Sequence, residues 1–247
     1  MDAHKDREII NNTLYDELGE RWYTAHDDPV ALLRAETREK LRWATPLLKQ
    51  GGVQTILDVG CGAGFAANLL AQENFTMTGL DFSQPSLDLA RKMDLSKTVE
   101  YIQGDAYQLP FPDASFDAVM AFDFLEHVSD PARVVKEISR VLKPRGQFLF
   151  HTFNRNWVAW LVVIKGVEWF VKNTPKNMHT LPLFIKPQEL EIFCNNAEMQ
   201  VARWTGLRPQ LNRSFFKMLG TRIVPETFEF IQTPSMMISY CGQAFKK

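Results

Sequence analysis

From residue 54 to residue 152 the chain alternates short apolar runs with amphipathic segments. The apolar runs read as five strands, TILDV, FTMTGLD, VEYIQGD, SFDAVMAF and QFLFHTF. Three segments between them, GFAANLLAQ, QPSLDLARKM and PARVVKEISRVLK, have helical spacing, and the last is expected to end at Pro144 and Gly146. Strands alternating with helices predict right-handed βαβ crossovers and a parallel sheet covered by helices on both faces.

A longer amphipathic helix is predicted ahead of this core. Its apolar positions recur at helical spacing from Pro29 to Leu48, and Gly51 and Gly52 close it. Ligand sites in doubly wound sheets lie at the carboxyl ends of the strands. The candidate chemistry is therefore expected where the five strands end.

Composition narrows the class of protein. The 247 residues carry a net charge of −1, which gives no electrostatic argument for a nucleic-acid partner. Three cysteines without a paired motif fit a reducing compartment. The first residues, MDAHKDREIINNT, are too polar for a signal peptide, and the apolar stretch at 157–164 is shorter than the ~18 residues that span a membrane. We expect a cytoplasmic protein.

The first strand ends in a glycine-rich turn, with Gly60, Gly62 and Gly64. Glycines there let a ligand approach the backbone closely. The dinucleotide fingerprint Gly-x-Gly-x-x-Gly requires a glycine where this chain has Phe65, and Asp58 would repel a diphosphate. A cofactor with an ammonium group would be attracted instead, which favours S-adenosylmethionine.

Two further strands end in acidic residues. Asp81 is placed to accept hydrogen bonds from both hydroxyls of a ribose, and Phe82 can cover one face of the adenine. Asp105 can accept a hydrogen bond from the adenine amino group, and Ala106 offers a backbone amide. The alternative for each aspartate is a turn or helix-cap role.

The motifs VGCGAG, TGLD, GDA, DAVMAFDFLEHVSDP and LKPRGQFLF resemble those of class I S-adenosylmethionine-dependent methyltransferases over residues 54–152. The resemblance implies an α/β fold with a Rossmann-like, doubly wound sheet of seven strands. These would be mostly parallel with one antiparallel strand, accompanied by N-terminal helices and a helical lid insertion. The segment TPSMMISYCGQAF at 233–245 is a candidate for part of the antiparallel end.

Residues 151–207 are similar to the ubiquinone-biosynthesis O-methyltransferases. The matching pieces are TFNRN, the helix ending at 166–168, Pro175 with Lys176 and His179, FIKPQEL, and TGL at 205–207. This resemblance implies methyl transfer to a phenolic or catechol hydroxyl of a polyprenylated ubiquinone precursor, with a quinone-biosynthesis protein complex as a further partner. Residues 208–232 depart from the family pattern, which leaves open the shape of the far wall of the acceptor pocket.

These motifs divide the chain into one methyltransferase domain, 1–247, with four parts. They are an N-terminal helical cap (1–50), a cofactor-binding core (54–152), a lid or membrane-contact insertion (153–186) and a C-terminal completion of the sheet (187–247).

Carried over from the family, the cofactor contacts fall on Gly60, Asp81 and Phe122, with Phe122 in place of a more usual methionine. The family's basic residue that binds the methionine carboxylate corresponds by spacing to Lys40. Arg34 and Arg38 compete for that role. A lysine keeps the charge but loses the planar, two-point grip of an arginine.

The motif DFLEH holds the candidate catalytic groups. Asp123, Glu126 and His127 stand at i, i+3 and i+4, which places them on one face if the segment is helical. The resemblance implies a Mg²⁺ ion at these three residues, and the alternative is a metal-free turn in which Glu126 or His127 caps a helix. Without a metal, His127 would deprotonate the ring hydroxyl, oriented by the neighbouring carboxylate, and the phenolate would attack the sulfonium methyl. His179 is the alternative base.

The stretch 156–185 combines aromatic and basic residues, a composition typical of a helix lying on a membrane. Peripheral contact with the inner face of the membrane and a lid over the pocket are both open. Other acceptors also stay open: another small phenol, a nitrogen or carbon acceptor, or no reaction at all in a non-catalytic assembly partner. The residues of the stretch are Trp157, Trp160, Leu161, Ile164, Lys165, Trp169, Phe170, Lys172 and Lys176.

Overall fold

The computed structural model describes residues 16–175 and 178–247. Residues 1–15, most of the predicted N-terminal cap that precedes α2 (Arg21–Thr24), lie outside the described residues. Lys176 of the aromatic and basic stretch also lies outside them. The long helix expected before the core is α3 (Val30–Gln50). It ends as predicted, with the Gly51 amide donating to the Leu47 carbonyl.

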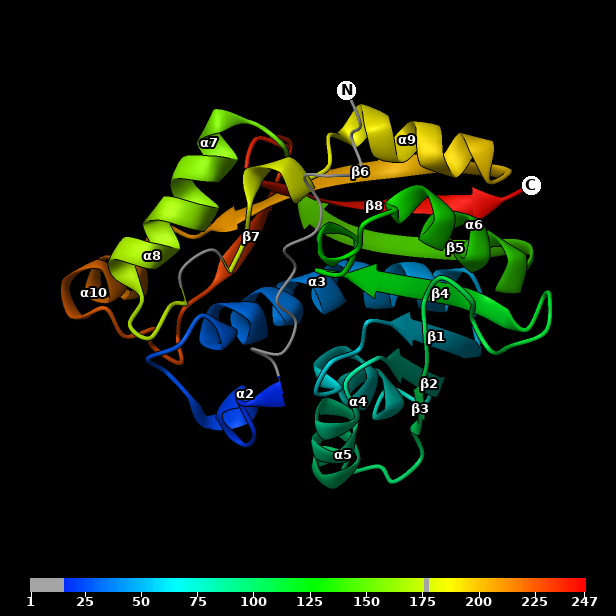
Figure 1. The fold of residues 1–247 in the computed structure, drawn as a ribbon, viewed down its shortest axis with the longest axis horizontal. Helices are drawn as coiled ribbons and strands as arrows, with labels where there is room; N and C mark the ends of the chain where they lie inside the picture. The colour runs from blue at the N-terminus through cyan, green and yellow to red at the C-terminus, as the bar shows by residue number, and fades with distance from the viewer. Residues whose placement is uncertain (1–15, 176–177) are drawn as a thin grey trace.

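The strands of the core alternate with helices and pair in parallel, which confirms the predicted fold class. Along the chain they are β1 (Thr55–Val59), α4 (Phe65–Ala71), β2 (Thr76–Asp81), α5 (Gln84–Met93), β3 (Glu100–Gln103), β4 (Phe116–Phe122), α6 (Pro131–Val141) and β5 (Leu142–Phe153). Figure 1 shows these strands as one twisted sheet with helices on both sides. The order β3-β2-β1-β4-β5 reverses between β1 and β4. Ligands bind at such a switch point.

The second half of the sheet is antiparallel and holds one strand more than predicted. It comprises β6 (Met199–Pro209), β7 (Phe230–Thr233) and β8 (Ser239–Lys246), in the order β5-β8-β6-β7, with each adjacent pair antiparallel. All of strand β8 except its last residue falls in the segment 233–245 that was expected to close the sheet. The expectation of seven strands with one antiparallel is therefore wrong in number: among the described residues there are eight, and β7 and β8 both run against the others.

Side chains on the two faces of the sheet belong to two separate hydrophobic cores. On one face α3, α4 and α5 pack against residues such as Ile56 and Met120. On the other, α6 and α9 (Pro187–Asn196) pack against residues such as Leu57 and Val119. Helix α6 ends at Val141, two residues before the predicted end, because Pro144 disfavours helical backbone at the residue before it. Leu142 instead begins β5 and pairs with Phe116.

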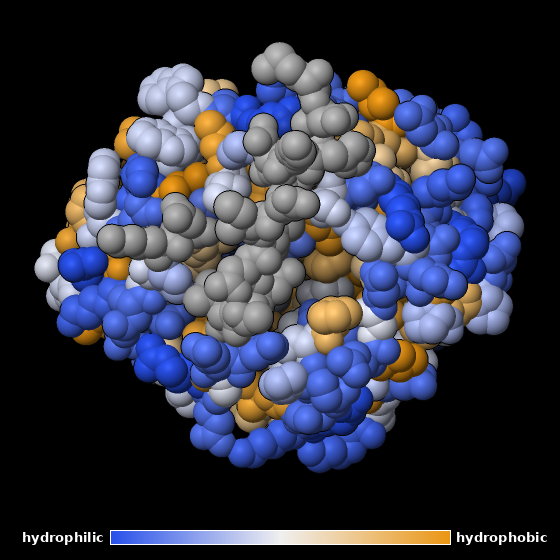
Figure 2. All heavy atoms as spheres, viewed as in Figure 1, coloured by the Kyte–Doolittle hydropathy of each residue, from blue (hydrophilic) through white to orange (hydrophobic). Residues whose placement is uncertain are grey.

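The lid insertion is a single run of helical turns. It consists of α7 (Trp157–Ala159), π-helical turns over Trp160–Gly166 and α8 (Val167–Phe170), followed by a 3-10 turn over Leu181–Leu183. Val163 and Ile164 are buried with Phe153 and Phe184, while several aromatic side chains of the lid face outward. Figure 2 shows hydrophobic side chains among polar ones on the side where Figure 1 draws α7 and α8.

Beyond the lid, α10 (Arg213–Thr221) packs beside α8 (Figure 1). No helix in the part of the chain that the structure describes combines the length and apolarity needed to cross a bilayer.

Candidate active site

The glycine-rich turn after β1 has a backbone that requires glycine. Gly60 has φ +73°, in the left-handed region, and a Cβ there would lie 2.1 Å from the Phe124 ring. The amides of Gly60 and Cys61 both donate to the Leu80 carbonyl, which fixes the turn against the end of β2. The turn thus brings bare backbone to the carboxyl edge of the sheet, as the sequence predicts.

Two carboxyl groups flank this turn, Asp58, which is buried, and Asp81, which is half-buried. Asp81 accepts hydrogen bonds from the Gly62 amide at 2.8 Å and the Ser83 amide at 2.9 Å, yet burial still raises its pKa. Burial, and then repulsion by Asp81, raises the pKa of Asp58 to about 7. A cation bound beside the two carboxylates would relieve that repulsion, so the site fits a ligand that carries positive charge.

Only one of the three expected adenine contacts lines the cavity. Phe82 does so with 79% of its surface exposed, as does Phe122, the buried cofactor contact carried over from the family. Asp105 is exposed and accepts a hydrogen bond from the Tyr107 amide at 2.8 Å, whereas Ala106 packs in the core. Neither lines the cavity, whose wall at the end of β3 is Gln103. The turn role that was the alternative for Asp105 is the one the structure supports.

Lys40 does not face the cavity. Its side chain is fully buried, and its ammonium contacts the Asp123 carboxylate and lies 3.5 Å from Glu36 Oε2. The competing basic residues are also engaged elsewhere, Arg34 with the Trp22 and Ala25 carbonyls and Arg38 with the Glu226 carbonyl. The prediction that Lys40 binds the methionine carboxylate of the cofactor is therefore not supported, since the Asp123 carboxylate already holds its ammonium group.

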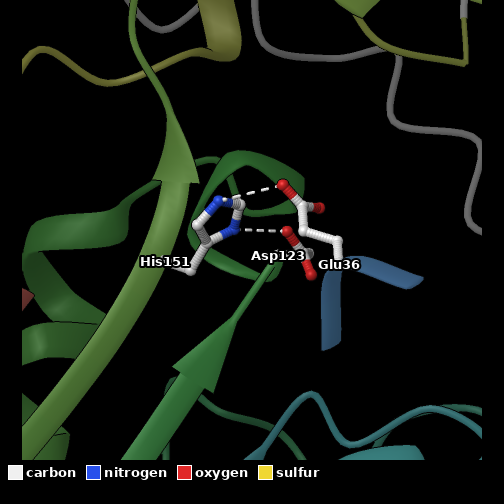
Figure 3. A group of neighbouring side chains, drawn as sticks. All are labelled: Glu36, Asp123 and His151. Carbon is white, nitrogen blue, oxygen red and sulfur yellow. Dashed lines mark hydrogen bonds and ion pairs between the residues drawn. The ribbon is translucent and has the colours of Figure 1, made fainter. Parts of the chain in front are cut away.

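His151 completes this buried network of charges, and the sequence analysis missed it. Its Nδ1 lies 2.6 Å from Asp123 Oδ1 and its Nε2 lies 3.3 Å from Glu36 Oε1 (Figure 3). Burial and Lys40 oppose a charge on the imidazole, but Glu36 and Asp123 outweigh them and raise the pKa of His151 to about 9. We call these four residues, Glu36, Lys40, Asp123 and His151, the charge quartet.

The DFLEH segment is not a helix that presents three ligands on one face. Asp123 has φ +52°, and a 3-10 turn over Leu125–His127 follows. Glu126 turns inward and accepts a hydrogen bond from the Thr152 hydroxyl at 2.8 Å. Among the described residues, the ligand atoms that gather within 4.8 Å of one another belong to Glu36, Asp123 and His151, and Lys40 already contacts Asp123 there. The predicted Mg²⁺ site at Asp123, Glu126 and His127 does not fit this geometry.

The two candidate bases lie together. The rings of His127 and His179 both line the cavity, with their centroids 5.5 Å apart, and His179 also packs edge-on against Phe153. Burial lowers the pKa of His127 to about 4, and burial together with His127 lowers the pKa of His179 to about 3. Both imidazoles are therefore neutral at pH 7, with a ring nitrogen free of a proton, and burial makes each a weaker base than a free imidazole.

The glycine-rich turn and the two histidines open onto one cavity of about 1030 Å³. That volume is at the upper end of the ~300–1,000 Å³ usual for one small ligand. Glu126 does not line it. The predicted site residues that do are Asp58, Gly60, Gly62, Asp81, Phe82, Phe122, Asp123, His127 and His179.

A second, apolar part of the cavity lies between α3, the lid and residues 209–230. Leu32, Val167, Phe215 and Phe230 are among its walls. Residues 208–232 were expected to form the far wall of the acceptor pocket, and several of them do line the cavity, but their departure from the family pattern left the shape of that wall unpredicted. The amphipathic spacing of α10, with Phe215, Met218 and Leu219 on one face, is the signal that could have indicated it.

Comparison with known proteins matches a family model described as a methyltransferase domain to residues 57–150. The chain is 34% identical over 197 residues to a ubiquinone biosynthesis O-methyltransferase of Thiobacillus denitrificans, a match that covers 78% of this chain and 84% of that protein. It is 33% identical over 210 residues to the protein of the same name from Klebsiella pneumoniae, covering 83% and 85%.

Among solved structures, a SAM-dependent methyltransferase from Thermotoga maritima superposes with a TM-score of 0.61 at 20% identity, over 92% of this chain and 94% of that one. A likeness at that identity concerns the fold alone.

Proposed function

The chain belongs to the ubiquinone biosynthesis O-methyltransferase family and is an S-adenosylmethionine-dependent O-methyltransferase; from this premise we propose that its acceptor is a phenol or catechol with a polyprenyl tail. The observation that carries the proposal is the two-part cavity. One part is lined by the glycine turn and buried carboxyl groups, and the other is apolar, with the two histidines lining the same cavity. An amphiphilic acceptor whose reactive hydroxyl sits at a polar end suits that arrangement.

The residues around the glycine turn fit the cofactor. Gly60 and Gly62 leave backbone accessible where a side chain would intrude, Asp81 is held by two amides in position to meet a ribose, and Asp58 suits a neighbouring positive charge. When bound, the cofactor supplies an electrophilic methyl group on a sulfonium. The protein's share of the rate then comes from positioning the acceptor and removing its proton.

In this proposal His127 accepts the proton of the acceptor hydroxyl. It lines the cavity, and its low pKa keeps a ring nitrogen unprotonated over the physiological range. His179, 5.5 Å away between ring centroids, is close enough to orient the acceptor or to share the proton. The charge quartet keeps Asp123 ionised, because Lys40 and His151 together hold the pKa of that carboxyl well below its usual range against the cost of burial.

We also propose that the lid contacts the membrane in which a polyprenylated acceptor resides. Trp157 is 71% exposed and Trp169 55%, and Lys165 and Lys172 lie in the same stretch. Flotation with anionic liposomes tests this: a Trp157→Ala, Trp169→Ala double variant should stay at the bottom of the gradient. Leu95→Ala, which removes an 81% exposed side chain outside the lid, should still float. If both variants float equally, the lid does not bind the membrane through these tryptophans, and its role is to cover the pocket.

The acceptor is tested with a prenylated catechol and methyl-labelled cofactor, with an amine of similar size in parallel. The expected product is labelled on oxygen. Asp81→Ala, which removes the acceptor of the Gly62 and Ser83 amides, serves as the inactive control that gives the background level of labelling. Labelling of the amine alone would overturn the proposed acceptor class.

A further inference from the structure

The apolar part of the cavity is built by segments far apart in the sequence. Helices α8 and α10 pack side by side, and Val171, Met218, Val224 and Phe228 are buried where they meet the first turns of α3. Backbone hydrogen bonds join the pieces, from the Lys172 amide to the Arg222 carbonyl at 3.0 Å and from the Val224 amide to the His26 carbonyl at 2.7 Å. We call this part of the cavity, bounded by α3, α8, α10 and β7, the apolar chamber.

Helix α3 connects the apolar chamber to the reacting end of the cavity. Leu32 belongs to the chamber, and Glu36, four residues later on the same face, lies at the charge quartet. One helical turn rises about 5.4 Å, so the chamber begins within about one turn of the charged groups. An acceptor whose ring lies near His127 therefore has the chamber as the adjoining apolar space for its substituent.

The walls of the chamber point to an uncharged occupant. Leu32, Val167, Phe170, Phe215, Leu219 and Phe230 line it. A peptide or a charged metabolite would leave polar groups without partners against such walls, which is costly, whereas an isoprenoid chain has none to satisfy. Because the chamber is continuous with the cofactor site, the occupant it fits is the tail of the acceptor itself.

We propose that α10 and the lid together form the tail-binding site of the acceptor, and that Leu219 is a specificity-determining residue for tail length. This inference rests on the proposed function, which it extends to a segment where the chain departs from its family. Leu219 is half-buried and faces the chamber, while its neighbour on the same helix, Phe216, is 61% exposed and does not line the cavity.

The test compares Leu219→Trp with the matched control Phe216→Trp. Each adds an indole to α10, but the first indole points into the chamber and the second into solvent. For a catechol with a farnesyl tail relative to the same catechol with a methyl group, Leu219→Trp should lower the ratio of kcat/KM about tenfold or more, the equivalent of roughly 1.4 kcal/mol of lost tail binding. Phe216→Trp should leave that ratio unchanged. Leu219→Ala, which enlarges the chamber without adding bulk, should shift the preference towards longer tails.

A binding measurement separates this inference from the proposed function. Farnesol, which has the tail without a ring, is titrated into the wild type and both tryptophan variants by calorimetry. If farnesol binds more weakly to Leu219→Trp but equally well to Phe216→Trp and the wild type, the result supports the tail-binding site. This holds even if no catechol is methylated, an outcome that would overturn only the proposed acceptor. Farnesol binding and tail preference that are equal in all three proteins would overturn the chamber, whatever the acceptor.

Discussion

Removing the charge of His151 is expected to change how the stability of the protein depends on pH. The pKa of this fully buried imidazole is raised from 6.5 to about 9 by Glu36 and Asp123. The folded protein therefore binds a proton more tightly than the unfolded chain. This contribution to stability is complete below pH 6.5 and is lost as the pH rises through 9. At about 1.4 kcal/mol per pKa unit it amounts to roughly 3 kcal/mol.

Other shifted groups act mainly at the edges of this window. The raised pKa values of Asp58 and Glu126, both at about 7, and the lowered pKa values of His127 and His179 affect stability below pH 7. Burial raises the pKa values of the thiols of Cys61, Cys194 and Cys241, so these groups lower the stability near pH 9, where the thiols of the unfolded chain ionise. All these groups are present in every variant, so the difference in slope between the wild type and a variant without His151 reports on His151.

The measurement is urea unfolding at pH 7, 8 and 9 for the wild type, His151→Gln and His26→Gln. Between pH 7 and 9 the free energy of unfolding of the wild type should fall by about 2 kcal/mol more than that of His151→Gln, as the linkage relation requires. His151→Gln should also be less stable at pH 7, because Glu36 and Asp123 then share only Lys40. His26→Gln, at a partly exposed imidazole, should follow the wild type. Parallel slopes in the wild type and His151→Gln would refute the charge quartet as a protonated network.

Three further outcomes are expected. Gly60→Ala should weaken cofactor binding in calorimetry by tenfold or more, about 1.4 kcal/mol, because the new Cβ would meet the Phe124 ring. Gly52→Ala, at a similar positive φ with no atom within 4 Å, should leave it unchanged, and equal loss in both would indicate backbone strain alone. His127→Ala should lower kcat by about 10²–10⁴-fold, the usual contribution of a general base, with little change in cofactor affinity; an equal loss of both would remove His127 from that role. EDTA should not change the initial rate, because Glu126 faces Thr152 rather than His127 and Lys40 occupies the remaining acidic cluster. Restoration of a lost rate by Mg²⁺ would contradict this.

The parts of the site that could be predicted from the sequence are those set by local backbone. The glycine turn and Asp81 follow directly from where strands end, and Gly60 and Gly62 have the conformations that only glycine adopts readily. The core strands were recognisable because both faces of the sheet are buried, so that each strand is a nearly continuous apolar run in the sequence. Boundaries set by a proline, such as the end of α6, were missed by two residues.

What could not be predicted depends on contacts between distant segments. Lys40 was assigned by spacing to a ligand, but spacing does not reveal that Asp123 and Glu36 reach it first. The i, i+3, i+4 argument for DFLEH assumed an α-helix, and the positive φ of Asp123 breaks that assumption. His151 looked like one polar residue in an apolar strand. Its role appears only when β4, β5 and α3 are brought together.

The two edges of the sheet have a consequence for how the protein behaves at high concentration. Within the part of the chain that the structure describes, the outermost strands, β3 and β7, have four residues each, the shortest in the sheet, and Pro234 directly follows β7. An edge strand offers unpaired backbone groups to another chain, and a short edge strand that is followed by a proline offers few. The inserted strand β7 therefore extends the sheet to support α10 while leaving little for another molecule to extend. We therefore expect the protein to resist aggregation through strand pairing at high concentration, although its lid exposes apolar side chains.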